Sequence, residues 1–431
     1  MDAQVDIREI PFKNDWWTSF VSETNHFKGH TVKKDVFDLY QIAELKELVA
    51  DTIRIITKDS LRIDNTGARI WLDGKYDENA NKFFQDHPIE DNQSVENWAE
   101  QTFQDGKKFG MFINFVTRHN ENLANKVNEL IDPYLSQFGI PLEGISATLI
   151  LGNYGWTPLG IHNDKRGEYI VHLHLGPGEK DMYIWEEENA KKKGFIHRRK
   201  VENKDDYMND YDAKYTFGTG DIFSMPGRCV HIGNTKDFSI GLVLEFNGYT
   251  SKSFSKKMWF DIGKTLMDKN FEGDKALVLP AYEEDDHEKY INYLMEHLKY
   301  TTTDTKADIQ KHLVKCFTDY KLGLLSNGGY VRAPYIDKVQ VKKDYLVQKD
   351  KPVIKLVESY NLQYYKNKNK LVVFVRKNRF SVDYRHEYVD LLEKLNNKEL
   401  VTVGDEYKTV EFSKFIELLF VNKGICFEDQ K

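Results

Sequence analysis

The feature that most limits the fold of this chain is a series of short apolar runs between residues 145 and 249. The runs are ISATLIL, EYIVHLHL, DMYIW, DIFSM, CVHI and SIGLVLEF, and turns containing Gly, Pro, Asn or Asp separate them. Short, evenly spaced strands with such breaks are typical of a β-sandwich or a jelly-roll barrel. We therefore expect a jelly-roll core over about residues 145–250.

The segments on either side of this core have a different pattern of apolar residues. Residues 39–53 and 123–131 carry apolar side chains at helical spacing, and Pro133 should kink or break the second helix. Between them, ARIWLDG and GMFINFV have the character of strands, and the Asp-Gly pair of the first indicates a hairpin. Residues 251–335 are predicted to be helical, and residues 336–431 alternate short strands with helices. The predicted fold class is therefore α+β.

Composition excludes several classes of protein. The net charge of −7 gives no overall field that favours nucleic acid, so we do not expect nucleic acid as a partner. The first residues, MDAQVDIREI, lack the apolar run of a signal peptide, and no stretch approaches the roughly 18 apolar residues that span a membrane. Three distant cysteines fit neither a zinc site nor a disulfide framework. We expect a cytoplasmic protein without a membrane partner.

Three residues in the predicted core could hold a metal ion: His162, Asp164 and His231. The first two are separated by one residue, so on an extended strand both side chains point to the same face. His231 follows after enough chain to complete most of a barrel, in a short strand bracketed by Gly-Asp and Pro-Gly turns. Two imidazoles and one carboxylate form the facial triad of non-haem Fe(II) oxygenases, which leaves other coordination positions open.

His172 and His174 are competing ligands, because they also share a strand face. If one of them joined His162 and His231, the site would have three histidines, as in some cupins and in catalytic zinc sites. In the other interpretation they line the barrel interior or pack as polar core residues.

A 2-oxoglutarate co-substrate would need a buried cation, or a cation with a hydroxyl group, for its distal carboxylate. The strand after His231, FSIGLVLEF, contains neither Arg nor Lys, so Lys180 in GPGEKDMYIW is the candidate. Thr148, Tyr154 and Tyr183 could add a hydroxyl group. Asn234 could orient the co-substrate or cap a turn.

One long segment interrupts the predicted strands. Residues 186–214 are rich in charged side chains, including EEENAKKKG and HRRKVENKDD. A loop of this length is usually functional or mobile, so it could be a solvated insertion or a lid that contacts the substrate.

The motifs resemble the JmjC-type branch of Fe(II)/2-oxoglutarate oxygenases, in particular the ribosomal-oxygenase-like, cupin-fold protein hydroxylases. TPLGIHND is similar to the His-x-Asp strand of that family, and GEKDMYIW to its Gly-x-Lys-x-Trp segment. GDIFSMPGRCVHIGNTKDFSIGLVLEF is similar to its Gly-Asp…Pro-Gly…His…Asn…Ser-x-Gly run. The resemblance implies that His162, Asp164 and His231 bind iron and that Lys180 binds 2-oxoglutarate.

The resemblance also implies a layout and an activity. The layout is a cupin catalytic domain over residues 1–250 with a double-stranded β-helix core, a helical region over 251–335 that could form a homodimer, and a winged-helix-like domain over 336–431. The activity is hydroxylation of an unactivated C–H bond in a protein or peptide side chain, with use of O₂ and release of succinate and CO₂. The spacing from Asp164 to Lys180 and the charged insertion depart from the family pattern.

Two other functions fit the residues. One is a cupin metalloenzyme that does not use 2-oxoglutarate, which would place His172 or His174 in the coordination sphere. The other is a catalytically silent barrel with a winged helix that binds nucleic acid, for which VRKNRF would supply a small basic stripe.

Overall fold

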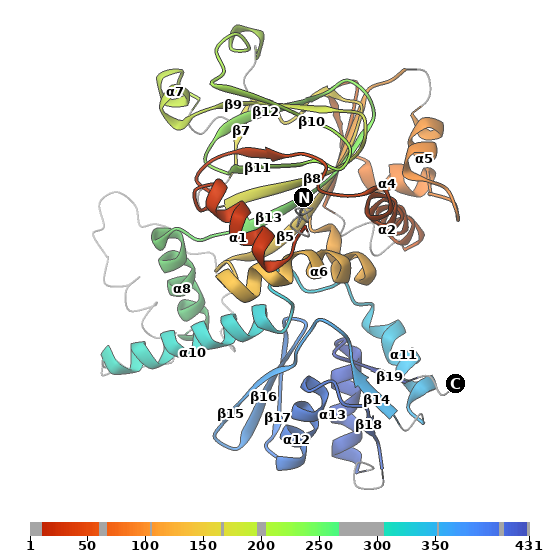
Figure 1. Cartoon of the computed structure of the whole chain (residues 1–431). Helices are drawn as coiled ribbons and strands as arrows, with labels where there is room; N and C mark the ends of the chain where they lie inside the picture. The colour runs from red at the N-terminus through yellow and green to blue at the C-terminus, as the bar shows by residue number, and fades with distance from the viewer. Residues whose placement is uncertain are drawn as a thin grey trace, which may run out of the picture. The chain divides into compact units, whose positions relative to one another are not determined.

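The chain consists of helices and antiparallel sheets, so the predicted α+β class is confirmed (Figure 1). The computed structural model describes residues 11–59, 67–103, 106–164, 168–195, 204–266, 306–350, 353–404 and 409–428. By its internal contacts the chain divides into two compact units. One comprises Met1–Tyr249 together with Leu324–Lys431, and the other comprises Thr250–Gly323.

The larger sheet of the first unit contains strands from both the predicted core and the segment before it. In spatial order its eight strands are β1 (Thr31–Lys33), β11 (Ile222–Pro226), β8 (Glu168–Pro177), β13 (Ser239–Asn247), β5 (Gly144–Gly152), β4 (Phe109–Ile113), β2 (Ala68–Leu72) and β3 (Lys75–Asp77). All neighbours are antiparallel. The predicted Asp-Gly hairpin is the turn between β2 and β3.

The second sheet carries the histidines of the predicted metal site. Its order is β10 (Ala213–Phe217), β9 (Lys180–Trp185), β12 (Val230–Thr235) and β6 (Gly155–Trp156), and the short β7 (His162–Asn163) also pairs with β12. The six apolar runs of the sequence thus correspond to β5, β8, β9, β11, β12 and β13. Strand β10 lies at the end of the charged segment, where no strand was predicted.

Helices cover one face of the larger sheet, and the alternation of its strands explains why. In β5, Ala147, Leu149 and Leu151 belong to the main hydrophobic core, whereas Thr148 and Ile150 face the opposite side. The helical partners in that core come mainly from α1, α2 and α6 (Figure 1). The helices of this part are α1 (Asn14–Glu23), α2 (Leu39–Lys58), α4 (Ala80–Asp86), α5 (Val95–Thr102), η1 (Val116–Arg118), α6 (Glu121–Phe138), α7 (Glu187–Lys192) and η2 (Lys204–Asp206).

The C-terminal part of the first unit has a hydrophobic core of its own. It contains two three-stranded antiparallel sheets, ordered β18-β14-β19 and β15-β16-β17. Its elements are α11 (Lys338–Gln348), β14 (Val353–Leu356), β15 (Gln363–Asn367), β16 (Lys370–Val375), β17 (Asn378–Asp383), α12 (His386–Asn396), β18 (Val401–Thr402), α13 (Val410–Val421) and β19 (Ile425–Phe427). The predicted alternation of strands and helices is therefore observed.

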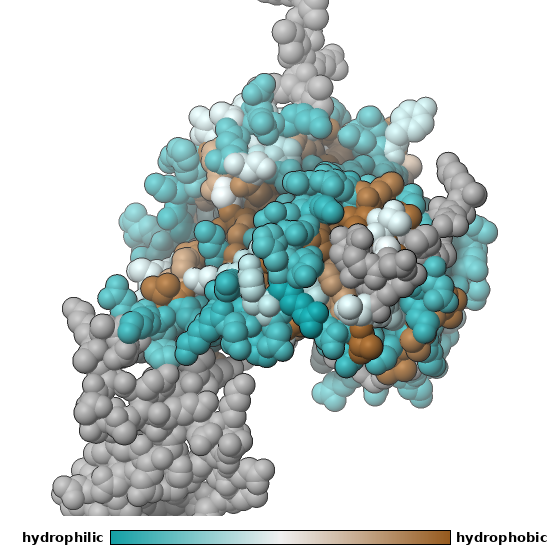
Figure 2. Space-filling view, turned by 90° about the horizontal axis from the view of Figure 1, so that it is seen from below, coloured by the Kyte–Doolittle hydropathy of each residue, from teal (hydrophilic) through white to brown (hydrophobic). Residues whose placement is uncertain are grey.

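The second unit is helical where it is described, as predicted. It contains α8 (Ser251–Leu266) and most of α10 (Lys306–Leu325), and residues 267–305 lie outside the described part. The face of the molecule in Figure 2 is mainly hydrophilic, with scattered hydrophobic residues. Among the described helices, none is long and apolar enough to cross a membrane.

Candidate metal centre

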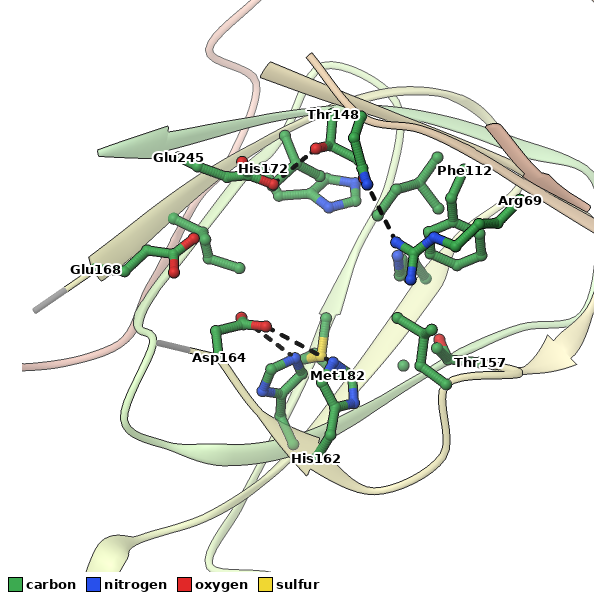
Figure 3. A pocket seen from close by; sticks show the side chains of 18 residues that line it. Arg69, Phe112, Thr148, Thr157, His162, Asp164, Glu168, His172, Met182 and Glu245 are labelled. Atoms are coloured by element: carbon green, nitrogen blue, oxygen red, sulfur yellow. Dashed lines mark hydrogen bonds and ion pairs between the residues drawn. The ribbon is translucent and has the colours of Figure 1, made fainter. Parts of the chain in front are cut away.

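Strand pairing brings the three predicted metal ligands together. Strand β7 pairs with β12 in a register that sets His162 opposite His231, and Asp164 directly follows β7. Nε2 of His162 lies 3.7 Å from Oδ1 of Asp164, and Nε2 of His231 lies 3.8 Å from Oδ2 (Figure 3). Within the described parts of the chain, these three form the one group of histidine, cysteine or acidic residues with all ligand atoms within 4.8 Å of one another.

Backbone carbonyls fix the orientation of both imidazole rings. Nδ1 of His162 lies 2.8 Å from the carbonyl oxygen of Gly160, and Nδ1 of His231 lies 3.1 Å from that of Cys229. A carbonyl accepts a hydrogen bond, so Nδ1 carries the proton in each ring and the Nε2 lone pair faces Asp164. Burial, with the neighbouring His162, lowers the pKa of His231 to about 4, so its imidazole is neutral at pH 7. A neutral, oriented imidazole is the form that binds metal ions.

Beside this group lies a cavity of about 130 Å³ between the two sheets. His162 and His231 of the second sheet, together with Asp164 directly after β7, line one side of the cavity. Strands β5, β8 and β13 of the larger sheet form the facing wall (Figure 3). A water molecule occupies roughly 30 Å³ of liquid, so the cavity has room for a small organic ligand.

Lys180, the first residue of β9, lies in this cavity and is only 4% exposed. Gly233 on the adjacent β12 leaves room for it, because a Cβ there would lie 3.0 Å from Lys180 Cε. The ammonium group lies 5.9 Å from the ring centre of Tyr154, and no carboxylate of the described residues forms an ion pair with it. A buried ammonium group without a counter-ion is costly, so this site favours a bound anion.

The hydroxyl and amide candidates lie in different environments. Thr148 lines the cavity, but its hydroxyl donates a hydrogen bond of 2.7 Å to Oε1 of Glu245. Tyr154 is buried near Lys180, and its hydroxyl has no hydrogen-bond partner among the described residues. Asn234 pairs through β12 with Trp156 and Asp181. The residues lining the cavity include neither Tyr154 nor Asn234, nor Tyr183.

The competing histidines lie on the other sheet, in β8, and neither belongs to the group around Asp164. His174 Nε2 donates to the carbonyl of Gly178 at 2.6 Å, and its Nδ1 lies 3.4 Å from Nε2 of His172. Burial lowers the pKa of His174 to about 4 and that of His172 well below its ordinary value. His172 lines the cavity, whereas His174 lies behind it. These positions match the interpretation of the pair as interior residues.

The cavity also contains polar residues that the sequence interpretation missed, chiefly Glu245, Glu168 and Arg69. The sequence of its strand could have identified Glu245 as a residue of the cavity wall. In SIGLVLEF it has the same parity as Val243, and both line the cavity. A glutamate on the interior face of an otherwise apolar strand is therefore the available signal. Arg69 lies on β2, outside the predicted core, so no local pattern connects it to the site.

The described part of the charged insertion packs behind the candidate metal ligands. Ala190 of α7 and Phe195 join Trp185, Val230 and Ile232 in one hydrophobic cluster. The last two residues flank His231 in β12, and alternation places them on the opposite face of the strand from that histidine. Residues 196–203 lie outside the described residues, so the lid interpretation stays a hypothesis.

No protein-family model and no curated protein sequence matches the chain. Several solved structures are similar to it. One described as an X-ray structure of ycfD from Escherichia coli covers 95% of this chain and 98% of its own, with 14% identity and a TM-score of 0.49. Another, described as YcfD, a ribosomal oxygenase, in complex with cobalt and 2-oxoglutarate, covers 96% and 98%, with 14% identity and a TM-score of 0.46.

A third similar structure is SnoK, described as a non-haem α-ketoglutarate-dependent carbocyclase from nogalamycin biosynthesis. It covers 57% of this chain and 93% of its own, with 10% identity and a TM-score of 0.33. The ribosomal oxygenase is the kind of protein that the sequence motifs resemble.

Proposed function

We propose that this protein is an Fe(II)- and 2-oxoglutarate-dependent oxygenase that hydroxylates a C–H bond, with release of succinate and CO₂. The observation that carries the proposal is the convergence of His162, Asp164 and His231 beside the buried Lys180 in one cavity. One end of this arrangement fits a divalent metal ion, and the other fits a carboxylate group.

The donor set fits ferrous iron. Two imidazole nitrogens and one carboxylate oxygen suit this metal, and three protein ligands leave positions for a co-substrate and O₂. His162 and His231 would each bind through Nε2, since Nδ1 is engaged with a backbone carbonyl. Iron bound there would supply the activation of O₂, coupled to the decarboxylation of 2-oxoglutarate.

Lys180 would bind the distal carboxylate of 2-oxoglutarate. Tyr154, whose ring centre lies 5.9 Å from the ammonium group, packs beside it but does not line the cavity. Burial strengthens this charge pairing and keeps water from competing for the ammonium group. The apolar residues Ile150, Ile170 and Val243 line the same cavity and would limit the number of water molecules that share it with the co-substrate.

The substrate and the domain roles are further parts of the proposal. The substrate would be a side chain of a protein or peptide, as the motif resemblance implies. The two sheets would form a double-stranded β-helix, and the C-terminal part would be winged-helix-like. The second unit could mediate a homodimer, because it exposes the large hydrophobic residues Trp259, Phe260, Val314 and Phe317. Light scattering over a range of concentrations would measure the oligomeric state.

The test of the metal and co-substrate sites uses the purified full chain. Anaerobic addition of Fe(II) and 2-oxoglutarate should give a visible charge-transfer absorption band, and admission of O₂ should release succinate. Asp164→Ala and His231→Ala should abolish both signals, and Lys180→Met should raise the 2-oxoglutarate concentration required. His386→Ala, at an exposed histidine of α12, is the matched control. Full turnover by either ligand variant would show that the assignment is wrong.

Succinate formation also separates the proposal from a cupin enzyme that does not use 2-oxoglutarate. Such an enzyme would bind iron through the same residues without decarboxylating the oxoacid. Mass spectrometry of candidate peptides for a gain of one oxygen would then identify the substrate.

A further inference from the structure

A second hollow lies in the first unit, outside the cavity between the two sheets. Its volume is about 550 Å³, and no described residue lines both hollows. Helix α5 forms one side of it, so we call it the α5 groove. Glu100 and Pro177 in its lining are exposed, which shows that it opens to solvent. Ligand pockets commonly have volumes of this order.

Three phenylalanine rings form the apolar part of the α5 groove. The rings of Phe103 and Phe109 are stacked with their centres 3.5 Å apart, and the ring of Phe238 lies 6.0 Å from that of Phe109. Phe103 and Phe109 are buried, whereas Phe238 is half-buried. Aromatic rings favour contact with an apolar body, and their π faces attract cations.

Backbone hydrogen bonds hold this aromatic wall in place. The side chain of Asn153 accepts from the N–H of Phe109 at 2.9 Å, and its backbone N–H donates to the carbonyl of Phe109 at 3.1 Å. The N–H of Gly178 donates to the carbonyl of Phe238 at 2.9 Å, next to the pairing of Pro177 with Ser239. The wall is therefore formed before a ligand binds, which reduces the ordering cost of binding.

The opposite side of the α5 groove is acidic. Glu96 and Glu100 are one turn apart on α5, and no basic residue of the described chain lines the groove. Glu96 forms an ion pair of 2.7 Å with Lys46, whereas Glu100 forms none with a described residue. Like charges at this spacing destabilise a helix, so a cation bound beside Glu100 would offset their repulsion.

The α5 groove shares a turn with the cavity of the candidate metal centre. Pro177 lines the groove, and Lys180, three residues later, lines the cavity. Three residues of chain span at most about 11 Å. A ligand in the groove would therefore lie beside the proposed co-substrate site without occupying it.

We propose that the α5 groove is a second ligand site, which binds a small organic cation with an apolar body, of the arylalkylammonium class. The apolar body lies against the rings of Phe103 and Phe238, and the ammonium group lies beside Glu100. Aromatic rings together with a carboxylate select such a molecule over an anion or a neutral molecule. This inference does not depend on the proposed oxygenase function.

The test measures the binding of small probes by isothermal titration calorimetry of the metal-free full chain. Phenethylammonium has both the ring and the charge, phenethyl alcohol has the ring alone, and methylammonium has the charge alone. Phenethylammonium should bind about tenfold more tightly than either of the others, because it uses both sides of the groove. Equal affinity for phenethylammonium and phenethyl alcohol would overturn the inference.

Variants of the two sides locate the binding. Glu100→Gln, at an exposed position of α5, should weaken phenethylammonium binding about three- to fivefold and leave phenethyl alcohol unchanged. Glu100→Lys should weaken the cation further. Phe238→Ala should weaken both probes, because it removes apolar contact. Glu387→Gln, at an exposed glutamate of α12 outside the groove, is the matched control and should bind as the wild type does.

Glu245→Gln separates the α5 groove from the cavity between the sheets, which also contains carboxylates. It should leave phenethylammonium binding unchanged. Weaker binding in Glu245→Gln, with normal binding in Glu100→Gln, would place the cation in the cavity and overturn the inference. The charge-transfer band with Fe(II) and 2-oxoglutarate tests the oxygenase proposal separately, because the calorimetry uses neither.

Discussion

At the scale of single residues, local spacing was enough to predict that His162, Asp164 and His231 converge, but it was not enough to predict the cavity wall. His162 and Asp164 could be paired because alternate residues share a strand face, and the turn before His231 indicated a returning strand. The partner of Thr148 could not be predicted. Its hydroxyl bonds to Glu245, which is 97 positions away in sequence and reached only through the pairing of β5 with β13.

The buried carboxylate of Glu245 should reduce stability at neutral pH. Because burial raises its pKa, ionisation opposes folding, and stability is lost as pH rises through the pKa of the folded state. Glu245→Gln should therefore stabilise the protein by about 1 kcal/mol at neutral pH. The gain should vanish below the unfolded pKa of about 4.3. Urea unfolding at both pH values measures the difference, and a less stable variant at neutral pH would contradict the explanation.

Gly241 is required by the packing of His172. A Cβ at this position would lie 2.3 Å from Nε2 of His172, whose ring is buried and already in contact with His174. Gly241→Ala should therefore destabilise the protein by about 1–3 kcal/mol, the usual cost of overpacking a core. Gly218→Ala is the control, because its Cβ would make ordinary contacts of 3.7 Å or more. Similar unfolding midpoints for the two variants would show that the ring can move aside.

At the scale of elements, the apolar runs predicted the strands well, and the failures have physical causes. Helix α6 continues through Pro133 to Phe138, so Pro133 does not break the helix, and the alternative expectation of a kink stays a prediction. Proline removes one backbone donor, but Ile131 and Tyr134 on either side are buried in the core and hold the helix. Strand β10 was missed because it begins at the end of the charged segment, although its alternation of exposed and less exposed residues is itself a strand signal. Pairing with β9 stabilises it.

The N-terminus of α2 is stabilised by a capping box. The Asp38 carboxylate accepts from the backbone N–H of Gln41 at 2.8 Å, and the Gln41 side chain accepts from that of Asp38 at 3.0 Å. Asp38→Ala should lower the free energy of unfolding by about 1 kcal/mol. Lys13, which precedes α1, makes no side-chain capping bond, so Lys13→Ala should leave stability unchanged. Equal effects of the two substitutions in chemical denaturation would argue against the capping contribution.

At the scale of the whole molecule, separate cores could be predicted from the change of pattern along the chain, but their contacts could not. The C-terminal part has its own hydrophobic cluster, distinct from the one around the larger sheet. Arg376, which follows β16, is 2% exposed, and it connects this part to α6. In the sequence it belongs to VRKNRF and resembles a solvated basic stripe. Its burial depends on Glu121, which is 255 positions away.

Arg376 makes several contacts at once. Its Nη1 donates to Oε1 of Glu121 at 2.8 Å, its Nε donates to Oδ1 of Asn327 at 3.2 Å, and its guanidinium carbon lies 3.4 Å from the ring centre of Tyr360. Burial alone would raise the pKa of Glu121, but Lys423 and Arg376 offset this and hold it below its ordinary value. The contact therefore stabilises the fold when Glu121 is ionised.

Arg376→Ala should destabilise the protein by about 3–5 kcal/mol at neutral pH, because it leaves a partly buried carboxylate with Lys423 as its remaining partner. A lowered folded pKa means that the stabilisation is present above the unfolded value of about 4.3 and is lost as pH falls through the folded pKa. The loss of stability caused by Arg376→Ala should therefore be smaller at acid pH than at neutral pH.

Since the C-terminal part and the part around the larger sheet each have a core, the Arg376→Ala variant should also unfold in two steps in urea when followed by circular dichroism and tyrosine fluorescence. A single transition with wild-type midpoint would show that other contacts hold the C-terminal part in place.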